Sequence, residues 1–196
     1  MIIVLLGPPG VGKGTQAKII VERHGVAHLS TGDMLREEKA SGSALGKKVQ
    51  AIMDRGDLVS DAVIEELITA RIGLPDCKPG FILDGAVRTV PQAEMVDRVL
   101  KARGRAVDVA ILMEVDEDEL VNRLKRRIRD AKDRGLPVRA DDNEETFRKR
   151  QKVFRDQTAP LIPYYQAQGK LRTIDGMGAI EEVAAAIAGV LKEIRN

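Results

Sequence analysis

Residues 7–15 read Gly7-Pro8-Pro9-Gly10-Val11-Gly12-Lys13-Gly14-Thr15 and come directly after the apolar run Ile2–Leu6. A Gly-x-x-x-x-Gly-Lys pattern between a buried strand and a helix predicts a loop whose backbone N–H groups surround phosphate oxygens. Glycines suit this loop because its amides turn inward through positive φ angles that other residues resist. The start of the next helix adds partial positive charge, and Lys13 adds a full one. The stretch therefore predicts a phosphate-binding loop, and a plain glycine-rich turn with an exposed lysine is the alternative.

The rest of the chain alternates short β-rich runs with longer helical patterns. This alternation predicts an α/β protein with a parallel sheet, and the continuous apolar runs are typical of strands buried on both faces. The expected strands are Ile2–Leu6, Val26–Leu29, Phe81–Leu83, Val109–Val115 and Leu171–Ile174. The expected helices are Gly14–His24, Asp33–Asp54, Ala62–Ile72, Pro91–Arg103, Asp116–Arg134, Asp141–Gln168 and Ala179–Ile194. The long interval between the second and third strands predicts a small helical insertion near residues 30–59.

Composition narrows the class of protein. The 196 residues carry a formal net charge of +2, with 43% hydrophobic and 32% charged residues, so the chain is an ordinary globular protein without the overall charge of a nucleic-acid or membrane binder. The single cysteine, Cys77, excludes an internal disulfide and suits a reducing compartment such as the cytoplasm. No run approaches the roughly 20 apolar residues of a membrane helix. Met1–Leu6 is too short for a signal peptide.

Two segments carry a family resemblance. The form Gly12-Lys13-Gly14-Thr15-Gln16, with Gly14 where commoner loops have a magnesium-binding Ser or Thr, resembles the nucleoside monophosphate kinases. Residues 29–36, Leu-Ser-Thr-Gly-Asp-Met-Leu-Arg, resemble the element of the adenylate kinase family that receives the monophosphate nucleotide. The resemblance implies that Thr31 meets the base edge and that the forked guanidinium of Arg36 meets the phosphate. A helix N-cap at Thr31 or Asp33 is the alternative. Related pyrimidine nucleotide kinases usually carry a different residue at the Thr31 position, so the resemblance implies AMP as the acceptor.

Residues 81–92, Phe-Ile-Leu-Asp-Gly-Ala-Val-Arg-Thr-Val-Pro-Gln, resemble a third signature of that family. Asp84 follows a predicted strand at the edge where α/β sheets bind ligands, and its carboxylate can hold Mg²⁺ through water. The resemblance implies that Arg88 reaches the AMP phosphate, that Gln92 reaches the adenine, and that residues 56–61 wrap this base with backbone groups. The implied metal-binding residues are Thr15 and Asp84, and the implied AMP-binding residues are Thr31, Arg36, Asp57, Leu58, Val59, Gly85, Ala86, Val87, Arg88, Gln92, Arg139 and Arg150.

One pair of residues departs from the family pattern. Ala86-Val87 stands where the family has Phe-Pro, and that proline usually follows a cis peptide bond. A non-proline residue adopts the cis form at a cost of about 2.5–4 kcal/mol. We therefore expect a trans bond or a strained loop at Val87, with some displacement of Arg88. We also expect that Ala86→Phe and Val87→Pro together would tighten AMP binding.

Residues 122–155 form the most basic part of the chain, with thirteen Lys and Arg against six Asp and Glu. A solvated helix laced with ion pairs and a nucleic-acid patch are two interpretations. The third is a lid that closes on polyphosphate, and it is favoured because residues 123–127 and 139–150 resemble the two ends of the adenylate kinase lid. The resemblance implies that Arg123 stacks on the ATP adenine, that Arg127 binds its phosphates, and that Arg139 and Arg150 converge on the transferring phosphoryl group and AMP. Asp141 and Asp142 either orient arginines or cap the helix. The short lid, residues 127–137, holds no cysteine or histidine, so no zinc is expected.

The resemblance to the adenylate kinase family covers nearly the whole chain. It implies a three-layer P-loop NTPase fold with a central five-stranded parallel sheet, divided into a core (1–29, 60–126, 138–196), an AMP-binding insertion (30–59) and the lid (127–137). It implies Mg²⁺-dependent phosphoryl transfer between ATP and AMP in a monomer that binds only small nucleotides. Asp175-Gly176-Met177-Gly178 resembles the turn that faces the ATP adenine. The implied catalytic residues are Lys13, Arg88, Arg127, Arg139 and Arg150, and the ATP-binding residues are Gly10, Val11, Gly12, Lys13, Gly14, Thr15, Arg123, Arg127 and Gly178.

Three rival functions stay open at this point. A UMP/CMP kinase would share the short-lid plan, a P-loop ATPase would need a residue that positions water, and a basic adaptor would bind nucleic acid in a salt-dependent way. His24 and His28 fall outside every motif and are interpreted as structural or surface residues.

Overall fold

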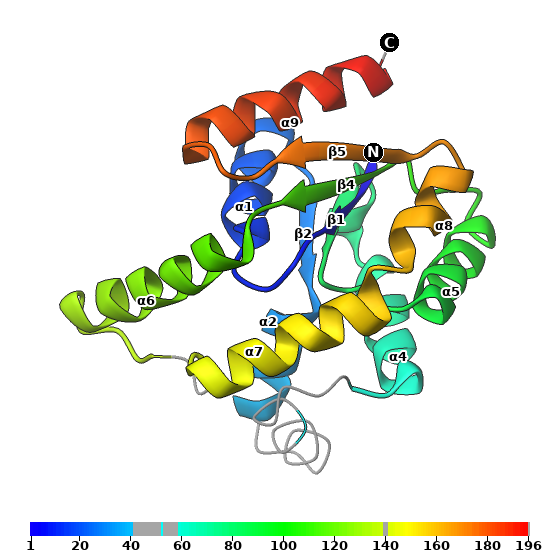
Figure 1. Ribbon diagram of the computed structural model, residues 1–196. Coiled ribbons are helices and arrows are strands. Elements are labelled where there is room, and N and C mark those ends of the chain that lie inside the picture. The colour runs from blue at the N-terminus through cyan, green and yellow to red at the C-terminus, as the bar shows by residue number, and fades with distance from the viewer. Residues whose placement is uncertain (41–51, 53–58, 139–140, 196) are drawn as a thin grey trace.

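A five-stranded parallel sheet forms the centre of the protein. The computed structural model describes residues 1–40, 52, 59–138 and 141–195, and Figure 1 draws the remaining segments as a thin grey trace. Within the described residues the strands are β1 (Ile2–Leu6), β2 (Ala27–Ser30), β3 (Phe81–Asp84), β4 (Val109–Glu114) and β5 (Leu171–Asp175). Their order in the sheet is β2-β3-β1-β4-β5, and every neighbouring pair is parallel. The predicted class and sheet are confirmed.

The register of the sheet brings the polar ends of its strands to one edge. Strand β1 is buried along its whole length, as its five consecutive apolar residues predict. Leu5 pairs with Asp84 at the end of β3, and Leu6 pairs with Leu112 near the end of β4. Because all strands run the same way, the loops that follow Leu6, Asp84 and Asp175 leave the sheet at the same edge. This is the edge at which open α/β sheets bind their ligands.

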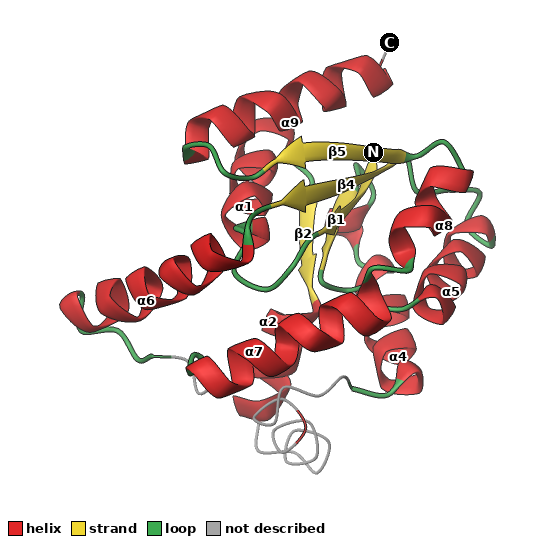
Figure 2. Cartoon of the chain, viewed as in Figure 1, coloured by secondary structure: helices red, strands yellow, loops and turns green. Residues whose placement is uncertain are grey.

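Helices cover both faces of the sheet, as Figure 2 shows. Alternate residues of β1 separate two core clusters: Ile2, Val4 and Leu6 pack on one face, and Ile3 and Leu5 pack on the other. The described helices of the first face are α2 (Thr31–Ala40), α4 (Asp61–Ile72), α5 (Val90–Lys101) and α8 (Leu161–Ala167). Those of the second face are α1 (Lys13–His24), α6 (Glu117–Asp133) and α9 (Ile180–Arg195), with Phe147 of α7 (Glu144–Val153) packed among them. A short 3₁₀ helix, η1 (Pro75–Cys77), precedes β3.

The prediction of one helix over Asp141–Gln168 is wrong. The structure has α7 (Glu144–Val153), a π-helix, η2 (Phe154–Thr158), and then α8. Asn143 caps α7, because its side chain accepts a hydrogen bond from the backbone N–H of Thr146 at 2.9 Å. Pro160 stands directly before α8, where a residue without an N–H interrupts the regular hydrogen-bond ladder. The wider π turn closes with a bond from Ala159 N to Phe154 O at 2.9 Å.

The remaining helices agree with the expected ranges to within two residues at most ends. The helix expected over Asp33–Asp54 begins earlier, at Thr31, and most of its second half lies outside the described residues. In Figure 1, α6 runs outward from the sheet and α7 lies at the end of the connection that follows it. None of the described helices combines the length and the apolar character that crossing a bilayer requires.

Candidate active site

A cleft of about 1140 Å³ opens at the carboxyl edge of the sheet. Its floor is the loop of residues 7–15 together with Asp84 at the end of β3, and its walls include α6 and the turn after β5. The motifs that were separate in the sequence therefore face one space.

The loop of residues 7–15 depends on glycine at two points of close approach. Gly7 has a φ of 143°, and a Cβ there would lie 2.7 Å from the carbonyl oxygen of Met113. Gly10 has a φ of 86°, and a Cβ there would lie 3.1 Å from the ring of Phe147. Gly12 is the N-cap residue of α1 and has no side chain to cap it, so no capping oxygen competes for the N–H groups of the first turn. Such a helix start favours an anion.

Lys13 is held by the loop that precedes it. Its Nζ donates hydrogen bonds to the carbonyl oxygens of Gly7 at 2.7 Å and Pro8 at 3.1 Å. Withdrawal from water lowers the pKa of Lys13 to about 8, which Asp84 opposes and the nearby positive charges of Arg88 and Arg150 reinforce. A bound polyphosphate would replace carbonyl dipoles with full negative charges and favour the protonated amine.

Asp84 contacts a residue that the sequence argument left out of the site. Its Oδ2 lies 3.1 Å from Nε2 of His28, and both side chains are mostly buried. The interpretation of His28 as a residue apart from the site is corrected, because it lines the cleft and meets the carboxylate. The signal was present in the strand pattern: β2 and β3 are neighbours, with His28 two residues before the end of β2.

The donor groups near Asp84 suit a magnesium ion held mainly by water and phosphate. Thr15 lines the same cleft, and a Cβ at the intervening Gly14 would lie 3.6 Å from Asp84 Oδ2. Within the described residues there is no group of three or more His, Cys, Asp or Glu that could hold a metal. Mg²⁺ keeps several waters and needs only one or two protein oxygens beside substrate phosphates, so one carboxylate and one hydroxyl fit it.

The predicted AMP side is a hydrogen-bonded layer around Gly85. Thr31 Oγ1 donates to Gly85 O at 2.7 Å, and Arg88 Nε donates to the same oxygen at 2.9 Å. Gln92 accepts from Arg88 N at 2.8 Å through Oε1 and donates from Nε2 to Asp61 at 2.8 Å. The hydroxyl of Ser30 caps the start of α2, since its Oγ accepts a hydrogen bond from Asp33 N at 3.2 Å. Thr31 therefore points at the loop instead of capping its helix.

Ala86 and Val87 are both buried in the core cluster on this face of the sheet. The described residues contain no cis peptide bond and no non-glycine residue with a positive φ. The Val87 bond is therefore trans, and its backbone avoids the left-handed region. The strained loop that we considered is absent at this position, while Arg88 is anchored on both sides by Gly85 and Gln92.

Arg123 joins the phosphate-binding loop to the turn after β5. Its Nη1 donates to Val11 O at 2.9 Å and its Nη2 donates to Gly176 O at 2.7 Å. Its Nε donates to Glu119 at 3.1 Å, and this hydrogen bond lowers the pKa of Glu119. All three hydrogen bonds lie in the plane of the guanidinium group. Its two flat faces are therefore available for stacking on an aromatic ring.

Two further arginines of the cleft are paired with carboxylates. Arg127 donates through Nε to Asp142 at 3.0 Å and through Nη2 to its other oxygen. Arg150 forms an ion pair with Asp141. The sequence left open whether these aspartates cap a helix or orient arginines. Since Asn143 is the cap of α7, the pairing is the observed role.

The structure brings most of the predicted residues to the cleft. Thr31, Val59, Ala86 and Gln92 are buried and are not among the described residues that line it. Asp57, Leu58 and Arg139 lie outside the described residues, as does the side chain of Arg36. The predicted residues that line the cleft are Gly10, Val11, Gly12, Lys13, Gly14, Thr15, Asp84, Gly85, Val87, Arg88, Arg123, Arg127, Arg150 and Gly178.

The sheet order, the glycine loop and the half-buried lysine at the start of α1 define an α/β protein of the P-loop NTPase class. Comparison with known proteins narrows this class. The protein-family model described as adenylate kinase matches residues 5–170. The chain is 49% identical over 191 residues to the adenylate kinases of Brucella melitensis biotype 1 and Brucella ovis, covering 97% of this chain and 98% of each relative. It belongs to the adenylate kinase family and is a phosphotransferase.

Proposed function

We propose that this enzyme transfers the γ-phosphoryl group of ATP to AMP, reversibly, to give two ADP, with Mg²⁺ as its cofactor. The observation that carries the proposal is one cleft in which a glycine loop with Lys13 faces Arg88, Arg127 and Arg150. Two nucleotides bring many negative charges into such a space and repel one another. A ring of cations offsets this repulsion and stabilises the charge that spreads over the oxygens of the transferring group.

The ATP triphosphate is proposed to bind along residues 10–15, with its adenine between the faces of Arg123 and the turn at Gly178. AMP is proposed to bind on the side of Thr31, Val59, Gly85, Ala86, Val87, Arg88 and Gln92, where Asp57, Leu58, Arg36 and Arg139 complete the set that the resemblance implies. Hydrogen bonds that Arg88 donates to Gly85 O and to Gln92 Oε1 hold it in place before a nucleotide arrives. This geometry favours in-line attack, because positioning supplies much of the rate in phosphoryl transfer.

No general base is required, because the attacking oxygen of AMP is already anionic. Bound Mg²⁺, held by Asp84 and Thr15 through water, would neutralise charge on the donor phosphates. Arg150 and Lys13 contact the transferring group, while Arg127 exchanges Asp142 for a phosphate. Closure of the lid over the two nucleotides excludes water, which would otherwise compete as the acceptor.

The division into a core (1–29, 60–126, 138–196), an AMP-binding insertion (30–59) and a lid (127–137) is part of the proposal. In the described residues the lid comprises the end of α6 and the turn that follows. We also propose a monomer in the cytoplasm. The buried free thiol of Cys77 supports a reducing compartment.

An acceptor panel tests the function. With ATP and Mg²⁺, AMP should give ADP in a coupled assay at a kcat/KM far above those of UMP and CMP, and a chelator should abolish the transfer. The relatives named above are adenylate kinases, which supports AMP over the pyrimidine nucleotides. Preferred use of UMP or CMP would contradict the proposal, as would ATP hydrolysis that outpaces ADP formation when AMP is present.

A further inference from the structure

Gln16 is a buried polar side chain between the phosphate-binding loop and the C-terminal helix. It follows Thr15 in the first turn of α1 and is 3% exposed. Its Nε2 donates a hydrogen bond to the backbone carbonyl of Ile180 at 3.0 Å. Ile180 is the first residue of α9. One side chain therefore ties the start of α1 to the start of a helix at the other end of the sequence.

The second polar atom of this side chain has no partner among the described residues. Gln16 Oε1 is buried and accepts no hydrogen bond from the part of the chain that the structure describes. An unmade hydrogen bond of a buried acceptor is destabilising, and an apolar side chain of the same shape would avoid that loss. Stability alone is therefore a weak explanation for an amide at this position. The contact with Ile180 matters more for the geometry it imposes.

The helix start that Gln16 holds follows directly from the turn of residues 175–178. This turn packs closely on β4, because a Cβ at Gly176 would lie 2.8 Å from Glu114 O. Gly176 N also donates to the same oxygen at 2.7 Å. On the far side of the turn, Ala179 N donates to Glu182 at 2.8 Å. Gln16 thus secures the C-terminal end of the turn, while Arg123 secures its middle.

We propose that Gln16 is a positioning residue of the donor-nucleotide site. Through Ile180 it fixes the turn of residues 175–178 relative to the loop of residues 7–15, so that one nucleotide engages both at once. This inference rests on the proposed function, in which the loop binds the triphosphate and the turn faces the adenine. Gln16 lies in the wall of the cleft, but its Nε2 is bonded to Ile180 O and its Oε1 is buried, so it acts through the turn. Loss of the Gln16 contact should therefore weaken the part of the ATP affinity that comes from the adenine base. The part that comes from the phosphates should stay unchanged.

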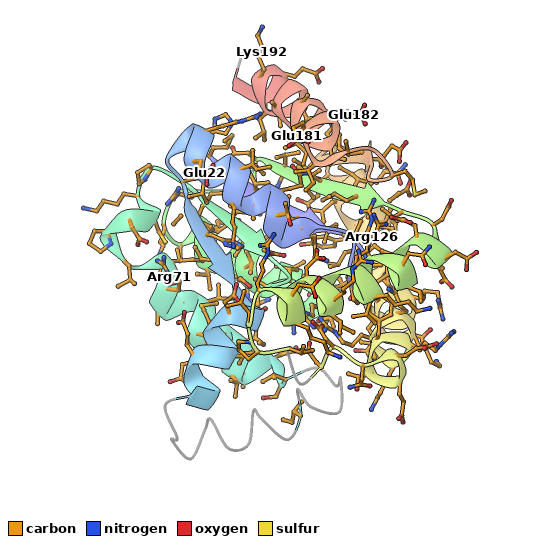
Figure 3. The ribbon with its side chains drawn as sticks, turned by 90° about the vertical axis from the view of Figure 1, so that its left-hand side faces the viewer. Glu22, Arg71, Arg126, Glu181, Glu182 and Lys192 are labelled. Atoms are coloured by element: carbon orange, nitrogen blue, oxygen red, sulfur yellow. The ribbon has the colours of Figure 1, made fainter. Side chains whose placement is uncertain are left out.

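A pair of ligands separates these two contributions. ATP engages the loop and the turn, whereas inorganic tripolyphosphate engages the loop alone. Gln16→Met keeps the length of the side chain and removes its hydrogen bond, and Gln16→Asn keeps the amide but is too short to reach Ile180. The control is Glu22→Met, on the exposed face of the same helix (Figure 3). Calorimetric titration of each folded variant, checked by its melting curve, gives both dissociation constants.

We expect both Gln16 variants to bind ATP about tenfold more weakly, the effect of losing one well-placed buried hydrogen bond. Their affinity for tripolyphosphate and their KM for AMP should stay within about twofold of the parent, and Glu22→Met should change neither. Unchanged ATP affinity in both variants would overturn the inference. So would an equal loss of ATP and tripolyphosphate, since Gln16 would then be shaping the loop itself. These binding results are independent of whether phosphoryl transfer to AMP occurs, so failure of the proposed function would be seen separately in the acceptor panel.

Discussion

The two positively charged sides of the cleft are built in different ways. In the loop of residues 7–15 the charge comes from backbone groups and from Lys13, whose amine rests on carbonyl oxygens of the loop. On the side of α6 and α7 it comes from arginines that rest on carboxylates, Arg127 on Asp142 and Arg150 on Asp141. The loop is thus set before a ligand arrives, whereas the arginines must exchange one anion for another. The preformed loop favours tight binding in a fixed geometry. The arginines favour a rearrangement of their ion pairs when a ligand binds.

The largest effect is expected from Lys13. Lys13→Ala removes the full charge of the preformed side, and kcat should fall about 1,000-fold because charge on the transferring group loses its closest amine. A coupled assay measures this loss. Lys192→Ala, an exposed change on α9 labelled in Figure 3, is the charge-matched control and should behave like the parent. Near-normal turnover of Lys13→Ala would refute the role of the loop charge.

Arg150 tests the exchangeable side. Arg150→Ala should lower kcat about 100-fold, and Arg150→Lys should recover only part of it, since a lysine lacks the planar fork that can move from a carboxylate to a phosphate. Arg148→Ala, two residues away and paired with Glu144 on the exposed face of α7, is the control. If Arg150→Lys matched the parent in a steady-state assay, the forked guanidinium would not be needed. The exchange of Asp141 for a phosphate would then not explain the role of Arg150.

A pH profile separates the two sides further. In the ligand-free protein the pKa of Lys13 is lowered from 10.5 to about 8. Above pH 8 the free enzyme therefore loses this charge, and kcat/KM for ATP should fall about tenfold for each pH unit. The arginines keep their charge throughout this range. A kcat/KM for ATP that stays flat to pH 10 would show that Lys13 remains protonated.

The lowered pKa of Lys13 also makes the free energy of unfolding depend on pH, and here the expected change is a rise where that of kcat/KM is a fall. Between pH 8 and 10.5 the folded protein has released the proton of Lys13 while the unfolded chain still holds it. Since the unfolded state binds more protons there, this group makes the free energy of unfolding rise with pH. Urea denaturation of the parent and of Lys13→Met should show this rise in the parent only.

The smallest effect is expected at the departure from the family pattern. Introducing the family's aromatic and proline with Ala86→Phe and Val87→Pro should lower the KM for AMP about two- to fivefold, because proline reduces the conformations open to the loop before Arg88. Both positions are buried, so the melting temperature reports whether the larger ring is accommodated. If neither the KM for AMP nor the melting temperature changes, the Ala86-Val87 pair does not affect AMP binding.

Sequence reasoning reached the sheet and the loop because both follow from local patterns. A buried strand, a glycine loop and a helix are adjacent in the chain, so Gly7–Thr15 could be interpreted without knowing the rest of the fold. His28 was missed because its significance depends on strand order: only when β2 lies beside β3 does its ring reach Asp84. Gln16 was missed for the same reason, since its partner Ile180 is remote in sequence. The carboxylate partners of Arg127 and Arg150 were foreseen as one of two options, and the cap at Asn143 decides between them.

The π turn of η2 lets one stretch of chain serve both sides of the sheet. Phe147 of α7 packs into one core cluster, and Leu161 and Tyr165 of α8 pack into the other. A π turn holds one more residue than an α-helical turn, and it rotates everything beyond it about the helix axis. Deleting a single residue, such as the exposed Gln157, would let this turn relax to regular helix. The rotation of α8 that follows would remove Tyr165 from its core cluster. Length at this point of the chain is therefore constrained more tightly than residue identity, and single-residue deletions should be far less tolerated there than exchanges of the exposed side chains.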